Sequence, residues 1–113
     1  MFEFTLEKAT KLAKQKNWDK LRHKLNKNDP KIGAIVAQAC STVDDDGSYN
    51  ILIELMKHDQ RPIKLAAVRG LGELGRDAAR THISWLKQHT PESDTEMHAA
   101  ISEAMAKIRH DKN

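Results

Sequence analysis

The sequence has little of what several protein classes require. It contains one cysteine, three prolines, five glycines and five aromatic residues among 113 positions. A single cysteine, Cys40, excludes an intramolecular disulfide and favours a reducing compartment. So few prolines and glycines cannot supply the many turns of an all-β sandwich. Because aromatic residues make up only 4%, alanine, leucine and isoleucine must fill the core, which suits closely packed helices.

Long apolar stretches are also missing. No segment approaches the roughly 20 apolar residues that a membrane span needs, and the first residues show neither a basic region nor an apolar run typical of a signal peptide. Charged residues make up 31% and apolar residues 39%, which is a globular composition. We therefore expect one soluble, cytoplasmic domain without membrane contact.

The most informative feature that is present is a repeated helical pattern. Three segments carry small or apolar residues at the spacing i, i+3, i+4, i+7, i+8 and i+11, which is one face of an α-helix. The second segment follows the first by 31 residues, and the third follows the second by 34. The positions are Ile32, Ile35, Val36, Ala39, Cys40 and Val43, then Ile63, Ala66, Ala67, Gly70, Leu71 and Leu74, then Met97, Ala100, Ile101, Ala104, Met105 and Ile108. We expect these side chains to form the core.

Each of these helices follows a polar turn that contains an aspartate, and an earlier amphipathic helix precedes the turn. Asp29, Asp59 and Asp94 are predicted to accept hydrogen bonds from the free N–H groups at the start of the next helix. Pro30 and Pro62 suit the first turn of a helix, where a missing N–H group costs nothing. The turn chemistry therefore predicts three helix–turn–helix units.

Other residues mark where helices end. Pro91 should end the preceding helix near His89 or Thr90. Gly47 and Gly75 are predicted to be helix C-caps in the connections between units. A leading helix fits none of the units, and we expect it to cap the first one. The predicted single domain, 1–113, comprises a cap helix at 3–16 and repeats at about 17–43, 48–75 and 78–109.

The middle unit carries a family resemblance. Its sequence DQRPIKLAAVRGLGELG, at residues 59–75, resembles the HEAT-repeat family, especially the short bacterial form shared with phycobilisome-lyase-type repeats. The resemblance covers about residues 16–110. It implies an all-α fold, namely an α-α superhelix (solenoid) of three HEAT-like hairpins plus the N-terminal capping helix, with about seven helices. In the family, an arginine after each turn pairs with neighbouring turn aspartates. Its positions here hold Gly33, Lys64 and His98, so only Lys64 is expected to form such a pair.

The resemblance implies a surface for binding a protein partner. In the family, the second helices of the hairpins line a concave face that commonly holds the ligand. The corresponding candidate partner-binding residues here are Gln38, Leu65, Val68, Arg69, Glu73, Glu103 and Lys107. We predict that Arg69 faces Glu103 and that Glu73 faces Lys107. Such pairs either join the second and third units or orient a partner on the face.

An alternative surface is the basic leading third of the chain. Residues 1–43 hold nine Lys or Arg and four Asp or Glu residues, whereas the remainder is slightly acidic. The excess favours either a solvated helix surface or a ridge that binds the nucleic-acid backbone. The ridge candidates are Lys16, Lys20, Arg22, Lys24, Lys27 and Lys31.

No pattern points to catalysis. The sequence has no glycine-rich phosphate loop, no nucleophile motif and no acid–base pair, so we expect no enzyme activity, cofactor or small-molecule ligand. The acidic run at 44–46 does not match a calcium loop and is predicted to open the next helix electrostatically. The six histidines lack metal-ligand spacing, and no metal is expected.

The burial of Cys40, Trp18 and Trp85 can also be predicted from their positions in the helical pattern. Cys40 should be a buried, inert thiol, and Trp18 should belong to the core. Trp85 either packs at the edge of its hairpin, which we favour, or is partly exposed and anchors a contact. The sequence thus predicts a non-catalytic protein–protein interaction module, a small monomeric adaptor or scaffold, with nucleic-acid binding as the alternative.

Overall fold

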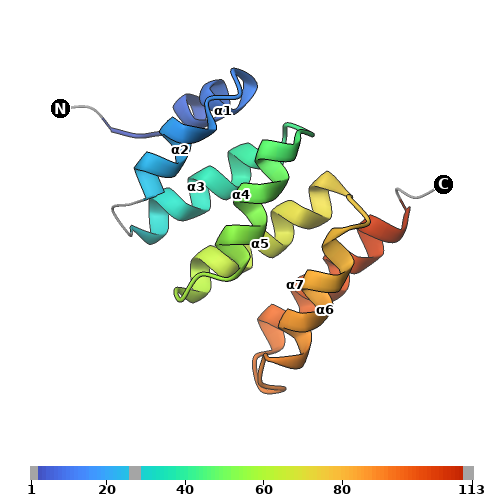
Figure 1. Ribbon diagram of the computed structural model, residues 1–113. Helices are drawn as coiled ribbons and strands as arrows, with labels where there is room; N and C mark the ends of the chain where they lie inside the picture. Colours follow the sequence, from blue (N-terminus) through green and yellow to red (C-terminus); the bar gives the residue numbers. More distant parts are fainter. Residues whose placement is uncertain (1–2, 26–28, 111–113) are drawn as a thin grey trace.

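The chain forms a small all-α structure. The computed structural model describes residues 3–25 and 29–110, and these residues form seven helices and no strand (Figure 1). The helices are α1 (Leu6–Lys14), α2 (Trp18–Leu25), α3 (Pro30–Cys40), α4 (Asp46–Met56), α5 (Arg61–Leu74), α6 (Ala79–Gln88) and α7 (Thr95–His110). The predicted helical class and number of helices are confirmed, although α1 is shorter at both ends than the predicted cap helix.

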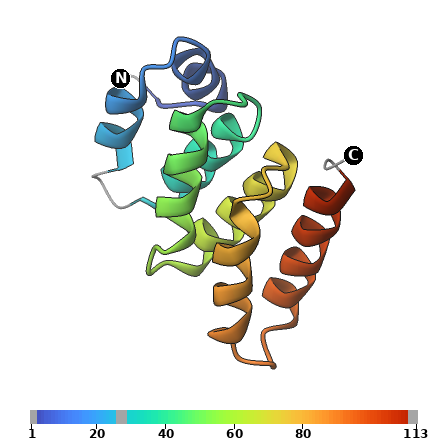
Figure 2. The same ribbon diagram turned by 45° about the vertical axis from the view of Figure 1, so that its right-hand side comes forward.

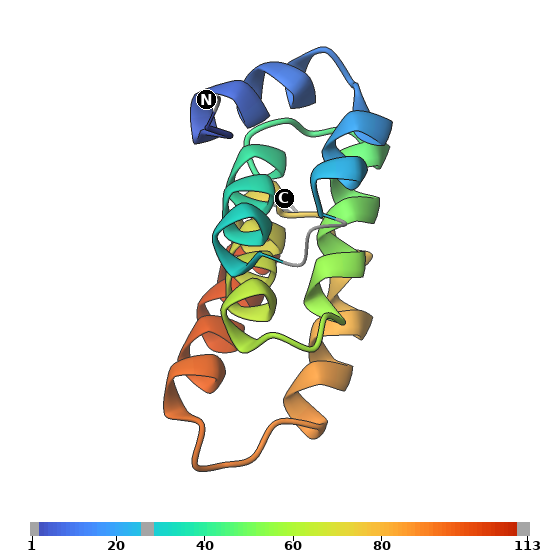
Figure 3. The ribbon, with the colours of Figure 1, turned by 90° about the vertical axis from the view of Figure 1, so that its left-hand side faces the viewer.

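The helices lie in two layers. α3, α5 and α7 form one layer, α2, α4 and α6 form the other, and α1 lies at one end (Figure 3). Consecutive helices α2 and α3, α4 and α5, and α6 and α7 run antiparallel (Figure 2). The Cα atoms extend over 42 × 33 × 17 Å, and the shortest extent accommodates two helices at their usual separation of about 8–10 Å. Because α5 packs against α3, α4 and α7, it is the central helix.

The core matches the repeated apolar pattern. All eighteen predicted positions are buried or half-buried, and all of them except Val43, which follows α3, lie on the second helices. The first helices add fully buried side chains such as Leu21, Leu52 and Ile83. These three residues are 31 positions apart, so the first helices repeat as the second helices do. The 3.6-residue periodicity therefore predicts buried positions of the second helices, although Leu65 and Val68 are also buried and lie outside the predicted set.

Two of the three predicted aspartate caps are confirmed. The Asp29 carboxylate accepts a hydrogen bond from the Lys31 N–H at 2.9 Å, and Asp94 accepts one from the Met97 N–H at 3.1 Å. The prediction for Asp59 was wrong, because Gln60 is the N-cap residue of α5 and its side chain forms no cap hydrogen bond. Gln60 stands three residues before Ile63, as Asp29 stands before Ile32, so Asp59 lies one residue too early in the repeat.

Most of the remaining predictions for helix ends are confirmed. Pro30 and Pro62 lie in the first turns of α3 and α5, and α6 ends just before His89, as expected from Pro91. Gly75 is a C-cap residue with a φ of 74°, which glycine adopts without strain.

The prediction for Gly47 was wrong, because this glycine lies in the first turn of α4 and not at a helix C-terminus. Asp45 caps α4 by accepting a hydrogen bond from the Gly47 N–H at 2.8 Å. A side chain at Gly47 would overlap the indole of Trp18. The glycine is therefore needed for helix packing and not for a turn, while the acidic run opens α4 as predicted.

Ion pairs connect each helix pair to the next. Arg22 of α2 forms two hydrogen bonds with Glu54 of α4, and Arg61 of α5 does so with Asp94, at distances between 2.7 and 3.2 Å. The partners are 32 and 33 residues apart, which is close to the 31- and 34-residue spacings of the repeated pattern. Lys64, which was expected to pair with a turn aspartate, forms no ion pair within the described part of the chain. Arg61 takes that role because it is the first residue of α5 and lies beside the start of α7.

Candidate functional site

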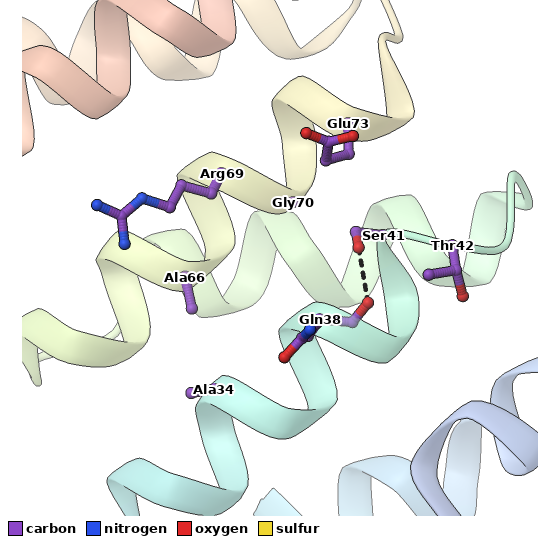
Figure 4. A pocket seen from close by; sticks show the side chains of 8 residues that line it. All are labelled: Ala34, Gln38, Ser41, Thr42, Ala66, Arg69, Gly70 and Glu73. Carbon is purple, nitrogen blue, oxygen red and sulfur yellow. Dashed lines mark hydrogen bonds between the residues drawn. The ribbon is translucent and has the colours of Figure 1, made fainter. Parts of the chain in front are cut away.

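A groove lies between the outward faces of α3 and α5. It has a volume of about 480 Å³ (Figure 4). Its lining residues are Ala34, Gln38, Ser41, Thr42, Ala66, Arg69, Gly70 and Glu73. Ala34, Ala66 and Gly70 keep its floor low, because none of them carries a side chain longer than one carbon. Polar side chains of both helices surround this floor, so the groove combines close backbone approach with specific polar contacts.

The groove brings together three of the seven predicted partner-binding residues. Gln38, Arg69 and Glu73 line it, and each is exposed. Glu103 and Lys107 are exposed on α7, outside the groove lining.

Leu65 and Val68 do not belong to the exposed surface, contrary to the prediction. Leu65 is 7% exposed and Val68 is fully buried. Both share a stripe of α5 with Gly72, where an added Cβ would lie 2.8 Å from the Ala104 Cα of α7. This stripe therefore faces α7. The exposed face of α5 is narrower than predicted, because helices cover α5 on three sides.

The two charged residues of the groove, Arg69 and Glu73, form ion pairs with residues of α7. Glu73 pairs with Lys107, as predicted, and this contact raises the pKa of Lys107. Arg69 does not pair with Glu103. Its guanidinium lies 3.8 Å from the carboxylate of Glu96 at the start of α7. About half of each of these side chains is exposed, so water screens both ion pairs. Charged groups of a partner can therefore replace these ion pairs with little loss of free energy.

The hydroxyl groups of the groove present acceptors to a partner. The Ser41 hydroxyl donates to the Gln38 carbonyl at 2.6 Å (Figure 4), and the Thr42 hydroxyl donates to the Ala39 carbonyl at 2.8 Å. Their protons are thus used within α3, which leaves oxygen lone pairs for incoming N–H groups. The Gln38 amide and the Arg69 guanidinium are the donors. The groove can therefore bind both N–H and carbonyl groups of another chain.

The predicted basic ridge is largely engaged in contacts of its own. Lys16 pairs with Asp45 at 3.4 Å, and Arg22 pairs with Glu54, which raises the pKa of Arg22. The Lys24 ammonium lies over the Phe4 ring, 5.2 Å from its centroid. Lys27 lies outside the described residues. Only two ridge candidates, Lys20 and Lys31, are exposed without an ion pair to another described residue.

Cys40, Trp18 and Trp85 differ in their burial. Cys40 is buried, as expected, and burial raises the pKa of its thiol to about 12, so the reactive thiolate is absent at neutral pH. Trp18 is half-buried against the core. The favoured interpretation of Trp85 was wrong, since this side chain is 51% exposed. Among the described helices, α6 packs mainly on α7.

The acidic run at residues 44–46 forms ion pairs and, within the described residues, no separate site. The acidic run binds Arg76, whose guanidinium lies 2.9 Å from Asp44 and 2.7 Å from Asp46. No group of three or more His, Cys, Asp or Glu side chains in residues 3–25 and 29–108 is arranged to hold a metal ion. None of the described helices is both long enough and apolar enough to cross a lipid bilayer. Comparisons with models of known protein families, with curated proteins and with solved structures gave no match.

Proposed function

We propose that this chain is a non-catalytic protein–protein interaction module, a small adaptor or scaffold, whose partner binds in the groove between α3 and α5. The observation that supports this proposal is the groove itself, with its low floor and with Gln38, Arg69 and Glu73 beside it. Small residues let a partner backbone approach closely, and the surrounding polar groups supply specificity. Glu103 and Lys107 on α7 extend the polar surface toward the third helix pair.

We further propose that the helices form a HEAT-like α-α superhelix, with α1 as its cap. Two features support this arrangement. The first and second helices occupy separate layers (Figure 3). Four ion pairs between successive helix pairs join residues 32 to 35 positions apart, close to the 31- and 34-residue spacings of the apolar pattern. In such arrays each unit contacts only its neighbours, and a continuous row of second helices becomes the binding surface.

The proposal is tested by photo-crosslinking in cells. A photoreactive amino acid in place of Gln38 should yield a discrete adduct with another protein, because this side chain is exposed beside the groove. Ala34→Glu should abolish the adduct by filling the floor with a charged side chain. The matched control is Ala99→Glu, because Ala99 holds the corresponding repeat position on α7 and is exposed outside the groove lining.

The control variant should keep the adduct, and both variants should keep the melting temperature of the unmodified chain. The absence of any adduct at Gln38 would contradict the proposed function. An adduct that Ala34→Glu leaves intact would place the partner outside the groove.

A further inference from the structure

The surface around Trp85 differs from the rest of the molecule. Trp85 and Leu6 are the only large apolar side chains that are exposed in the described residues, and Trp85 is the more exposed of the two, at 51%. It lies on α6, in the layer that does not contain the groove (Figure 3). An exposed indole offers a broad π-face together with an N–H donor, and such a side chain commonly anchors a ligand.

His89 holds this indole in place. The two rings are stacked, with centroids 4.0 Å apart and planes inclined by 21°. The His89 Nδ1 lies 2.8 Å from the Trp85 carbonyl oxygen. Because a carbonyl can only accept, Nδ1 must carry the proton that forms this hydrogen bond. The imidazole is therefore fixed against the indole, so a ligand that stacks on Trp85 meets an ordered aromatic wall.

Trp85 lines one hollow, and a second hollow adjoins the first. The larger has a volume of about 510 Å³ and is lined by Arg80, Thr81, Ser84, Trp85, Gln88 and Met105. The smaller, of about 290 Å³, is lined by Ser84, Lys87, Ile101, Ser102 and Met105. They share Ser84 and Met105, so they form one continuous surface, which we call the Trp85 surface. It carries hydroxyl, amide and thioether groups beside the aromatic wall.

The charge of the Trp85 surface is positive. Its lining includes Arg80 and Lys87 and no acidic side chain. Asp77 pairs with the Nε atom of Arg80 at 3.1 Å, and 39% of the Arg80 side chain remains exposed. Lys87 is exposed and forms no ion pair with another described residue. An anionic ligand is therefore favoured over a cationic one.

We propose that the Trp85 surface binds single-stranded nucleic acid. One base stacks on the indole of Trp85, and Arg80 and Lys87 contact the flanking phosphates. Thr81, Ser84 and Gln88 can form hydrogen bonds with the edge of the base. Single-stranded nucleic acid is the ligand class that combines a planar ring, hydrogen-bonding edges and regularly spaced negative charge.

A second copy of the chain suits this surface less well. Two copies of the Trp85 surface facing each other would bring like charges together. The exposed face of α1, with Lys11 and Lys14, is also basic and would likewise be repelled. The Trp85 surface is separate from the groove between α3 and α5, because the two share no lining residue.

The test measures binding of a fluorescein-labelled oligoadenylate of about 12 nucleotides by fluorescence anisotropy at about 50 mM salt. Trp85→Ala should weaken binding roughly 5- to 150-fold, the range that corresponds to stacking of one base on an aromatic side chain. Trp85→Phe should restore most of the affinity because it keeps a π-face. An abasic oligonucleotide of equal length should bind the unmodified chain more weakly than oligoadenylate does.

A control variant separates this surface from the basic ridge. Lys20→Gln combined with Lys31→Gln removes two exposed charges at the α1–α3 end and should lower the affinity far less than Trp85→Ala does. Ser84→Glu provides a second test, since it adds a carboxylate to both hollows and should weaken binding as Trp85→Ala does. Circular dichroism should show each variant to be folded.

The proposal is overturned by any of three results. The first is that oligoadenylate does not bind at low salt. The second is equal binding of the abasic and normal oligonucleotides, which would leave only phosphate contacts. The third is that the Lys20/Lys31 variant loses affinity while Trp85→Ala and Ser84→Glu do not, which would place the nucleic acid on the ridge.

Discussion

At the scale of single residues, Gly47 is required because a neighbouring side chain occupies the space that a Cβ atom would need. Gly47 lies in the first turn of α4 without a positive φ, and the Trp18 indole occupies the space beside its Cα. Gly47→Ala would normally favour a helix by about 0.5–1 kcal/mol. Here the added methyl group must displace the indole, and such overpacking costs about 1–3 kcal/mol. We therefore expect a lower free energy of unfolding in urea.

The matched control lies on the same helix. Asn50→Ala changes an exposed position of α4 to the same residue, and it should leave stability unchanged or slightly higher. If Gly47→Ala were as stable as Asn50→Ala, the indole would be free to move aside, and the close packing of α2 on α4 would not limit stability.

At the scale of helices, the start of α7 depends on one carboxylate. Asp94 accepts a hydrogen bond from the Met97 N–H and binds Arg61 of α5, so it both caps α7 and connects it to the preceding pair. These contacts, with Arg61 the larger cause, lower the pKa of Asp94 to about 2. A carboxyl group with a lowered pKa stabilises the folded state above the pKa it has when unfolded. That stability is lost as the pH falls from about 5 towards 2.

The expected outcome is a change in the pH profile of thermal unfolding. Asp94→Asn should lower the melting temperature at pH 7 and flatten its decline between about pH 5 and pH 2. Asp59→Asn is the control, because Asp59 is an exposed turn aspartate that does not cap α5. A parallel decline in Asp94→Asn and the unmodified chain would show that other carboxyl groups determine acid stability.

The same elements show what sequence reasoning can and cannot predict. The apolar spacing predicted the core of α3, α5 and α7 because helix periodicity determines which residues share a face. It did not reveal that the α5 stripe with Leu65 and Val68 faces α7, since that depends on how many helices surround α5. Arg61 as the partner of Asp94 was also missed, because long side chains reach partners that the backbone pattern does not specify.

The exposure of Trp85 was missed for a related reason. The first helices repeat at a 31-residue interval, which places Trp85 in register with His23 and Glu54. Glu54 is an exposed position that pairs with Arg22 of the preceding unit. The register therefore predicts a surface site for Trp85, and this signal was available in the sequence. The apolar nature of tryptophan favours the opposite, buried placement, which is why the exposure of Trp85 was not predicted.

At the scale of the whole molecule, neighbouring helices pack more closely in the layer of second helices than in the layer of first helices. The second helices form a continuous row in which α5 packs closely on α3 and α7, whereas α6 packs mainly on α7. The third helix pair is therefore attached mostly through the α5–α7 contact. Gly72 allows this contact, because a Cβ there would lie 2.8 Å from the Ala104 Cα and 3.0 Å from its Cβ. Both atoms are fixed to the backbone of α7 and cannot rotate away.

Gly72→Val should accordingly separate the third pair from the rest. Valine adds three carbons against the α7 backbone, so α7 must shift, and α6 has few other contacts to hold it. We expect hydrogen-exchange protection to fall in α6 and α7 while α3 and α4 keep most of theirs, since structural units open independently when their interface weakens. Ala106→Val is the control, because Ala106 occupies the corresponding position on α7 and is half-exposed. Equal loss of protection in all helices would instead mean that the molecule unfolds as one cooperative unit, so that a partner bound to α3 and α5 would also stabilise the Trp85 surface.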